Sequence, residues 1–372
     1  MTRRLRNILV TGGSGFIGCN FIRYLLGKVY NFNGRIINLD VLTYAGNRMS
    51  LADIETAHGP AAHGANARYF FEHGDICDRT FVESIFTKYE IDTVAHFAAE
   101  SHVDRSIHGP EAFIKTNVMG TFILLDVARN AWKDGNGNLR QDALFHHIST
   151  DEVYGSLGET GYFIETTAYD PRSPYSASKA ASDHLVMAYN HTYGMPVTLS
   201  NCSNNYGPYQ FPEKLVPLMI LNMMEGKALP VYGDGKNIRD WLYVEDHNSA
   251  VWEIMRSGKT GETYNIGGEN EWENIKLLNV LIDIVADKAR LDPAKIRDTI
   301  TYVKDRPGHD RRYAIDCSKL KRELGWKQAV SFEEGLLRTV LWYLSNTQWI
   351  EGIRSGEYMK WVETNYKERQ RL

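Results

Sequence analysis

The chain has 372 residues, which suggests about two domains at a soft average of ~150 residues per domain. Its hydrophobic content of 43% and charged content of 24% are typical of a globular protein that folds in water. The formal net charge of −4 gives no general reason to expect nucleic acid or a membrane as a partner. No apolar run in the sequence reaches the ~18 residues that a membrane-spanning helix needs.

The cysteines and histidines do not predict a disulfide framework or a metal site. The first residues, MTRRLRNILVTGG, are basic but are followed by only a short apolar run, so we expect a first strand there and not a signal peptide. His146 and His147 are adjacent, and on a strand they would face opposite sides. We expect reduced thiols in a cytoplasmic protein, because the cysteines are far apart and form no CxxC pair: Cys19, Cys77, Cys202 and Cys317.

Short β-rich runs alternate with longer helical patterns through the first half of the chain. Such alternation predicts an α/β fold, a doubly wound parallel sheet with helices on both faces. The segments 59–67 and 132–142 have the composition of surface loops. The predicted strands are, in chain order, 7–11, 35–40, 67–75, 92–99, 143–150 and 197–204.

The first strand, turn and helix, NILVTGGSGFIGCNFIRYLL, have the pattern of a dinucleotide-binding loop. Gly13, Gly15 and Gly18 fit GxGxxG, in which glycines let the backbone approach a pyrophosphate at a helix N-terminus. Asp40 ends the second strand about 20 residues later, where a carboxylate would bind a ribose diol. No arginine follows Asp40 directly, which favours NAD over NADP. The alternative for the glycines alone is an ordinary tight turn.

Two adjacent acids follow the fifth predicted strand, in the stretch HHISTDEVYG. Asp151 and Glu152 come directly after Ser149 and Thr150, at the carboxyl end of that strand. In parallel sheets this end is where ligands bind. The plainer interpretation is an acidic turn that caps the next element.

A helix with clear end signals follows, in PRSPYSASKAASDHLVMAYNHTYGMP. Ser173 can cap it, Pro174 suits its first turn, and Gly194 ends it. Tyr175 and Lys179 are four residues apart and therefore share one face. A tyrosine needs nearby positive charge to act as a base near neutral pH, and the lysine ammonium would supply it. Taken alone, such a pair is more often an ordinary surface pair.

The last part of the chain differs in composition. From about Tyr206 it is rich in proline, glycine and aromatic residues, with stretches such as GPYQFP, VYGDGK and DRPGHD around helical patterns. We predict a Rossmann-type NAD-binding domain over 1–205, with returning segments near 240–275, and a smaller substrate-binding domain over 206–372.

Several of these stretches resemble a known family. TGGSGFIG together with YxxxK resembles the extended short-chain dehydrogenases that act on nucleotide sugars. More specifically, AAESHVDRSI, STDEVYG, YSASKA, SNNYGPYQFPEKLVPL and DRPGHDRRYAID resemble the dTDP-glucose 4,6-dehydratases over nearly the whole length. The resemblance implies oxidation of the sugar at C4, elimination of water across C5 and C6, and return of the hydride to C6.

The resemblance also implies roles for individual residues. Tyr175 would be the base for C4 oxidation with Lys179 beside it, Asp151 the acid, Glu152 the base at C5, and Thr150 a hydrogen-bond partner of the sugar. It implies that NAD contacts Gly12, Gly15, Phe16, Ile17, Gly18, Asp40, Thr43, Asp75, Ile76, Ala98, Ala99, Ser101, Thr116, Tyr175, Lys179 and Asn205. It implies that the substrate contacts His102, Thr150, Asn204, Lys214, Leu215, Pro230, Val231, Tyr232, Arg239, Asn274, Arg306 and His309.

Partners and rival functions follow from the same resemblance. The helices predicted over 113–132 and 175–193 are apolar on more than one side, and the family pairs such helices in a four-helix homodimer contact. Coverage by the C-terminal domain is the alternative. The rival functions are a dehydratase of a CDP- or UDP-linked sugar, a nucleotide-sugar 4-epimerase, and a non-catalytic NAD-binding regulatory protein. An epimerase or a binding protein would have no use for the acid pair.

Overall fold

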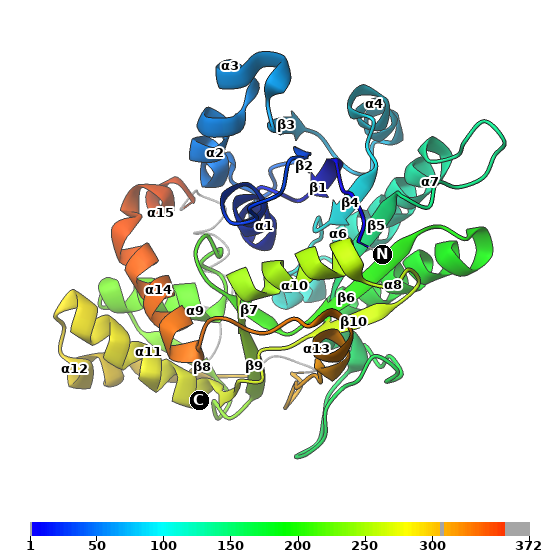
Figure 1. The fold of residues 1–372 in the computed structure, drawn as a ribbon. Helices are drawn as coiled ribbons and strands as arrows, with labels where there is room; N and C mark the ends of the chain where they lie inside the picture. The colour runs from blue at the N-terminus through cyan, green and yellow to red at the C-terminus, as the bar shows by residue number, and fades with distance from the viewer. Residues whose placement is uncertain (1, 306–308, 354–372) are drawn as a thin grey trace.

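The computed structural model describes residues 2–305 and 309–353 of the chain (Figure 1). Its centre is a parallel sheet with strand order β10-β6-β5-β4-β1-β2-β3. This confirms the predicted α/β fold with a doubly wound sheet. The strands are β1 Asn7–Thr11, β2 Arg35–Asp40, β3 Tyr69–His73, β4 Thr93–His96, β5 Leu144–Thr150, β6 Val197–Cys202 and β10 Thr263–Ile266.

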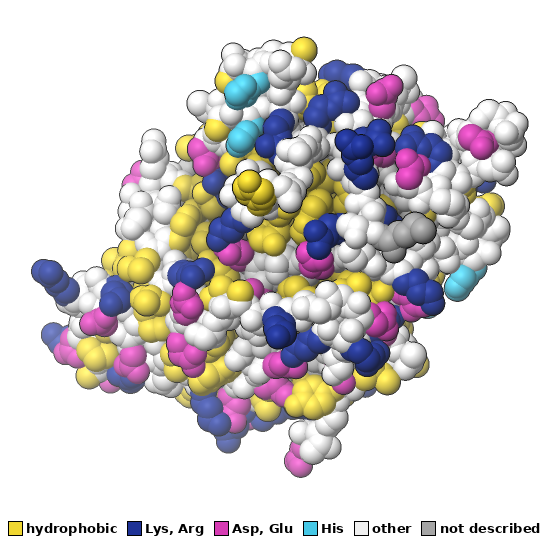
Figure 2. Space-filling view, in the orientation of Figure 1, with side chains coloured by type: hydrophobic (Ala, Val, Ile, Leu, Met, Phe, Trp, Pro, Cys, Tyr) yellow, Lys and Arg dark blue, Asp and Glu magenta, His cyan; other side chains and the backbone are white. Residues whose placement is uncertain are grey.

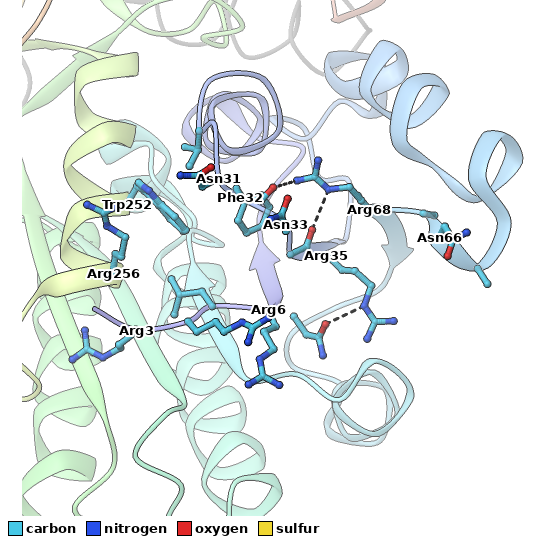
Figure 3. Close-up of a pocket in the computed structure, with 17 residues that line it drawn as sticks. Arg3, Arg6, Asn31, Phe32, Asn33, Arg35, Asn66, Arg68, Trp252 and Arg256 are labelled. Atoms are coloured by element: carbon cyan, nitrogen blue, oxygen red, sulfur yellow. Dashed lines mark hydrogen bonds between the residues drawn. The ribbon is translucent and has the colours of Figure 1, made fainter. Parts of the chain in front are cut away.

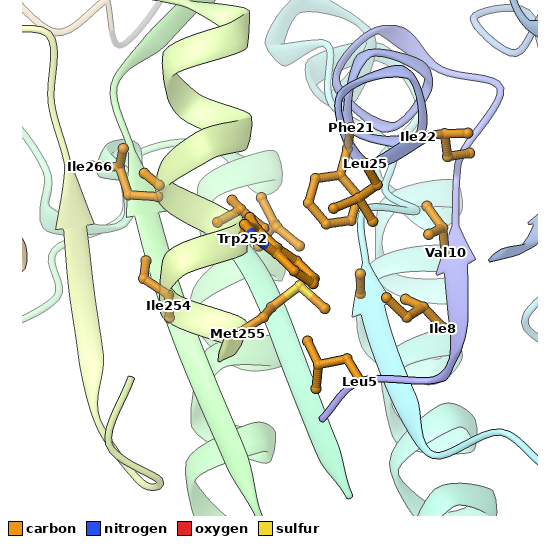
Figure 4. Packing of buried hydrophobic residues seen from close by; sticks show 14 of the residues in the cluster. Leu5, Ile8, Val10, Phe21, Ile22, Leu25, Trp252, Ile254, Met255 and Ile266 are labelled. Carbon is orange, nitrogen blue, oxygen red and sulfur yellow. The ribbon is translucent and has the colours of Figure 1, made fainter. Parts of the chain in front are cut away.

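Helices cover both faces of this sheet, because side chains of a strand alternate between the faces. On one face, Ile8 and Val10 of β1 pack with Phe21 and Trp252 (Figure 4). On the other face, Leu9 belongs to a second apolar cluster. The first face is covered by α1 Phe16–Gly27 and α10 Val244–Ser257, and the second by α4 Arg79–Tyr89, α7 Thr121–Ala131 and α8 Pro174–Tyr193.

The later part of the chain builds a second apolar core beside the sheet. A strand trio in the order β11-β9-β7 and a pair, β12-β8, lie there with the helices that pack on them. β10 instead returns to the edge of the seven-stranded sheet; the domain bounds given above stay a prediction. The elements of this part are β7 Asn204–Tyr206, β8 Leu229–Tyr232, β9 Ile238–Tyr243, β11 Glu271–Glu273, β12 Ile300–Val303, α9 Leu215–Met224, α11 Asn274–Ala289, α12 Pro293–Arg297, α14 Phe332–Ser345 and α15 Thr347–Ile353. α13 Ser318–Leu324 packs instead on α10 and β10, with the first core.

Two predicted strands and one predicted loop differ from the structure. The predicted strand 197–204 is divided, because the chain leaves the central sheet after Cys202 and joins β9 from Asn204 onward. The predicted strand 92–99 ends at His96. The predicted loop 59–67 contains a helical turn that begins at Pro60, where a proline fits the first turn of a helix. The remaining short helices are α2 Ala52–His58, α3 Pro60–His63, α5 Val103–His108 and α6 Pro110–Phe113.

The predicted helix 113–132 is interrupted by a π-helix, Ile114–Gly120, before α7 begins. Asn117 explains the wider turn. Its side-chain amide donates to the Glu100 carbonyl oxygen at 3.0 Å and to Ser178 Oγ at 2.8 Å. Its own carbonyl oxygen accepts hydrogen bonds from the hydroxyls of Thr121 and Ser182. The π-turn thus ties this segment to α8 and to the loop after β4.

Within the described residues, no helix has both the length and the apolar composition needed to cross a membrane. The same residues contain no group of three or more His, Cys, Asp or Glu side chains placed to hold a metal ion.

Candidate active site

A cavity of about 510 Å³ lies where β1, β4, β5 and β6 end. Every residue predicted to contact NAD lines it, as does every predicted catalytic residue. Three of the residues predicted to bind substrate also line it: Thr150, Asn204 and Lys214. The sequence therefore located this cavity, although the roles of its residues stay predictions.

The glycine turn after β1 leaves room for a ligand. Gly12 has φ +69°, and a Cβ there would lie 2.7 Å from the Ala98 Cα. A Cβ on Gly18 would lie 2.3 Å from the Gly12 carbonyl oxygen, so this glycine lets α1 approach the turn. The α1 N-terminus has no side-chain cap and no acidic residue in its first turn. Its free N–H groups and positive dipole end fit a pyrophosphate.

Asp40, at the end of β2, is buried beside this turn. Its two oxygens accept the backbone N–H groups of Ser14 at 2.9 Å and Leu42 at 2.8 Å. Burial raises the pKa of Asp40, and these two hydrogen bonds oppose the rise. A carboxylate has about four lone-pair sites, so capacity remains for a ribose diol. The glycine turn, the uncapped helix and Asp40 together fit NAD.

Tyr175 and Lys179 lie on the first turns of α8, as predicted. Ser173 caps this helix by a reciprocal hydrogen-bond pair with Ser176, and Gly194 ends it in the left-handed conformation. These local signals explain why both ends were predictable from the sequence.

Lys179 lies behind the tyrosine in a buried polar network. Its ammonium donates to the Ile148 carbonyl oxygen at 2.8 Å and contacts His147 Nε2 at 3.3 Å. Burial lowers the pKa of Lys179, and the charge of Asp183 raises it. Asp183 in turn accepts hydrogen bonds from Ser149 Oγ at 2.7 Å and from the Tyr169 hydroxyl at 3.1 Å.

Burial raises the pKa of Tyr175 well above its ordinary range, the charge of Glu152 raises it further, and a hydrogen bond with Thr150 opposes the rise. The phenol is buried beside a carboxylate, and the Lys179 ammonium contacts Ile148 and His147. That Lys179 prepares the tyrosine to act as a base stays a prediction.

The acid pair begins directly where β5 ends. Asp151 is only 2% exposed, and its Oδ2 is buried without a hydrogen-bond partner among the described residues. Burial raises the pKa of Asp151 well above its usual range, and the charges of Glu152 and Asp240 raise it further. The capping role belongs to Thr150, whose Oγ1 accepts the Glu152 backbone N–H at 3.3 Å. The surroundings of Asp151 thus favour its protonated form.

The other described residues predicted to bind substrate do not line this cavity, and all of them except His102 come from the later part of the chain. Tyr232 and His309 form an edge-to-face ring contact at 6.1 Å. Asn274 Oδ1 is buried with no hydrogen-bond partner in the described part of the chain. The residues that do not line the cavity are His102, Leu215, Pro230, Val231, Tyr232, Arg239, Asn274 and His309. Arg306 lies outside the described residues.

Arg239 is buried. Only 5% of it is exposed, and its predicted contact with the substrate stays a prediction. Its guanidinium donates to the carbonyl oxygens of Ile238 at 2.7 Å and Asp310 at 2.9 Å and lies over the Tyr313 ring at 4.4 Å. Lys214, by contrast, lines the cavity and donates to the Ser101 carbonyl oxygen at 3.0 Å.

Several cavity residues were missed from the sequence, although some lie inside the quoted motifs. Glu213 is buried and accepts from the Arg105 guanidinium at 3.2 Å. Burial raises the pKa of Glu213, and the charge of Lys214 opposes the rise. Arg105 and Glu213 are 108 residues apart in the sequence, and only folding brings them together. The missed polar residues are Lys115, Ser149, Ser203, Gln210 and Glu213.

Comparisons with known proteins agree with this geometry. Residues 9–339 match the family model described as GDP-mannose 4,6 dehydratase. The dTDP-glucose 4,6-dehydratase of Shigella flexneri is 54% identical over 372 residues, which cover 98% of this chain and 99% of that protein. The fold and the cavity define the class, a dinucleotide-binding dehydratase of nucleotide sugars. Within that class, the chain belongs to the dTDP-glucose 4,6-dehydratase family.

Solved structures of the same family are also similar. The dTDP-glucose 4,6-dehydratase of Bacillus anthracis, in complex with NAD, has a TM-score of 0.80 and 41% identity, covering 94% of this chain and 100% of that one. The dTDP-glucose 4,6-dehydratase of Streptomyces venezuelae, also with NAD bound, has a TM-score of 0.82 and 44% identity, with the same two coverages.

Proposed function

We propose that the protein converts dTDP-glucose to dTDP-4-keto-6-deoxyglucose and uses NAD as a tightly bound, recycled cofactor. The observation that carries this proposal is the placement of Asp151. It is a buried carboxyl with a raised pKa, next to Glu152, in the cavity that also contains Tyr175 and Lys179. A protein that only binds a dinucleotide does not need such a group.

Each step of the reaction has a residue suited to it. NAD, held by the glycine turn and Asp40, would supply the acceptor for the C4 hydride and then return this hydride to C6. Tyr175 takes the proton of the C4 hydroxyl, and Thr150 orients that hydroxyl through its own Oγ1. Glu152 then removes the C5 proton, which the neighbouring ketone acidifies. Asp151 gives its proton to the departing C6 hydroxyl.

The nucleotide would extend from the cavity toward β8 and the start of α11. Tyr232 of β8 and Asn274 of α11 supply an aromatic ring and an unpartnered amide oxygen there. Lys214, at the cavity wall, supplies a cation for the diphosphate. The curated relatives act on a dTDP sugar by name, which favours thymine over the bases of a UDP or CDP sugar.

We also propose a homodimer through the helices around residues 103–132 and α8. Three large apolar side chains of this region are strongly exposed: Ile107 by 39%, Ile114 by 50% and Met119 by 48%. A second copy would cover them in a four-helix contact. A cytoplasmic location is proposed because the cysteines are free thiols, as a reducing compartment keeps them: Cys19, Cys77, Cys202 and Cys317.

Incubation of the purified protein with dTDP-glucose, UDP-glucose and CDP-glucose tests the function. We expect a 4-keto-6-deoxy product from dTDP-glucose at a higher kcat/KM than from the other two. A higher kcat/KM with UDP-glucose or CDP-glucose would show that dTDP is not the preferred nucleotide of the substrate. A product epimerised at C4 with its C6 hydroxyl retained would contradict the dehydratase assignment altogether.

A further inference from the structure

A second cavity, of about 720 Å³, lies at the amino ends of the parallel strands, where β1 and β2 begin (Figure 3). It is formed by the residues that precede β1, the loop between α1 and β2, the residues before β3, and α10. Strands of five or six residues span ~15–20 Å, so this cavity is separate from the catalytic one.

The lining of this second cavity is strongly basic. Its arginines come from four separate places in the chain, and no aspartate or glutamate is among the lining residues that the structure describes. Lys and Arg side chains also gather near the first strands on the face drawn in Figure 2. We call this the arginine cavity, after Arg3, Arg4, Arg6, Arg35, Arg68 and Arg256.

Three of these six guanidinium groups are held by neutral acceptors, which orient them without cancelling their charge. Arg35 Nε donates to Asn7 Oδ1 at 3.0 Å. Arg68 donates to the carbonyl oxygens of Phe32 and Gly34. Arg3 donates to the Met255 carbonyl oxygen at 3.1 Å and to a threonine hydroxyl. The positive charges are therefore ordered but not neutralised.

The remaining arginines leave donors available. Arg256 pairs with Glu253 at 2.9 Å, but its Nε is buried and has no hydrogen-bond partner in the described chain. Arg4 and Arg6 are exposed at the cavity, and neither side chain forms an ion pair with any described residue. Burial lowers the pKa of Arg3, a penalty that an anion in the cavity would relieve.

We propose that the arginine cavity binds a linear polyphosphate of two or three phosphates, either inorganic or at the end of a nucleotide. Guanidinium groups match phosphate oxygens with two parallel donors, and several phosphates are needed to meet several arginines. The volume lies within the ~300–1,000 Å³ of small-ligand sites. The aromatic residues there, Phe32 and Trp252, are only 4% and 8% exposed, so they offer little ring surface to a base.

Calorimetric titration of the NAD-loaded protein with inorganic tripolyphosphate tests this. We expect one site per chain and an affinity that falls as salt rises. Arg6→Ala and Arg35→Ala should each weaken binding ~10-fold, as for loss of a charge-assisted hydrogen bond. Because the cavity leaves little ring surface for a base, ATP and GTP should bind within a few-fold of each other and of tripolyphosphate.

Two controls separate this site from the catalytic cavity and from general charge. Arg297→Ala removes a half-buried arginine of α12, paired with Asp283, and should leave the affinity unchanged. Lys214→Ala alters the catalytic cavity and should also leave it unchanged. Absence of binding, or an equal loss in Arg297→Ala, would overturn the proposal. So would a loss in Lys214→Ala with none in Arg6→Ala, or tighter binding of a single-stranded oligonucleotide than of tripolyphosphate.

Discussion

Asp183→Asn should change how the free energy of unfolding depends on pH. Asp183 is buried, and burial raises the pKa of its carboxyl to about 6, against an ordinary value of 3.8, while Lys179, Ser149 and Tyr169 oppose the rise. The folded state therefore binds this proton more tightly than the unfolded chain. The stabilisation from this proton is fully present below the unfolded pKa and is lost as pH rises through the folded pKa.

The magnitude follows from the shift. About 2 pKa units correspond to about 3 kcal/mol, of which about 2 kcal/mol is lost between pH 4.5 and 7.5. Asparagine keeps the side-chain volume and a carbonyl oxygen but does not titrate. The wild-type stability minus that of Asp183→Asn should therefore fall by about 2 kcal/mol over this range.

Urea denaturation of both proteins, with NAD saturating, measures this difference at each pH. The variant also lacks the negative charge that compensates Lys179. This loss changes its free energy of unfolding by a similar amount at each pH, so it does not produce the expected pH dependence. Curves that stay parallel within ~0.5 kcal/mol from pH 4.5 to 7.5 would show that Asp183 does not titrate there. The description of the buried network behind Lys179 would then be wrong.

Other substitutions test the catalytic tyrosine, the phosphate turn and the proposed dimer. Tyr175→Phe should lower kcat by ~10²- to 10⁴-fold while calorimetry finds substrate affinity retained; near-normal turnover would mean that another group takes the C4 hydroxyl proton. Gly18→Ala should reduce the NAD that co-purifies, since its Cβ would meet a carbonyl oxygen at 2.3 Å, whereas Gly27→Ala, with nothing within 4 Å, should not. Ile114→Asp should convert a dimer to a monomer in light scattering, and Tyr30→Asp, at a side chain 96% exposed, should leave the mass unchanged; a dimer that survives Ile114→Asp would refute this interface.

Much of the fold was predictable because its signals are local. β1, β2 and the ends of α8 are where the sequence places them, since a glycine turn, a capping serine and a terminal glycine each act on adjacent residues. The catalytic cavity was predictable for a related reason. Parallel strands bring their carboxyl ends to one edge, so the residues after β1, β4 and β5 meet there.

The features that were missed depend on contacts between distant parts of the chain. The π-helix requires Asn117 to reach Glu100 and Ser178, and no periodicity shows that. The burial of Arg239 requires the carbonyl oxygen of Asp310, 71 residues away. The arginine cavity brings together residues as far apart in the sequence as Arg3 and Arg256. In the sequence, each of its arginines looks like an ordinary surface residue.

The central claim is that Asp151 and Glu152 act as acid and base in the elimination. The most direct measurement is rapid-quench mass spectrometry of Asp151→Asn and Glu152→Gln with dTDP-glucose in deuterated water. In Asp151→Asn, bound NADH and a 4-keto-glucose intermediate should accumulate, and deuterium should enter C5. In Glu152→Gln, C4 should still be oxidised, but without rapid exchange at C5. Dehydration by both variants at the wild-type rate would contradict the claim and reduce the acid pair to a turn at the end of β5.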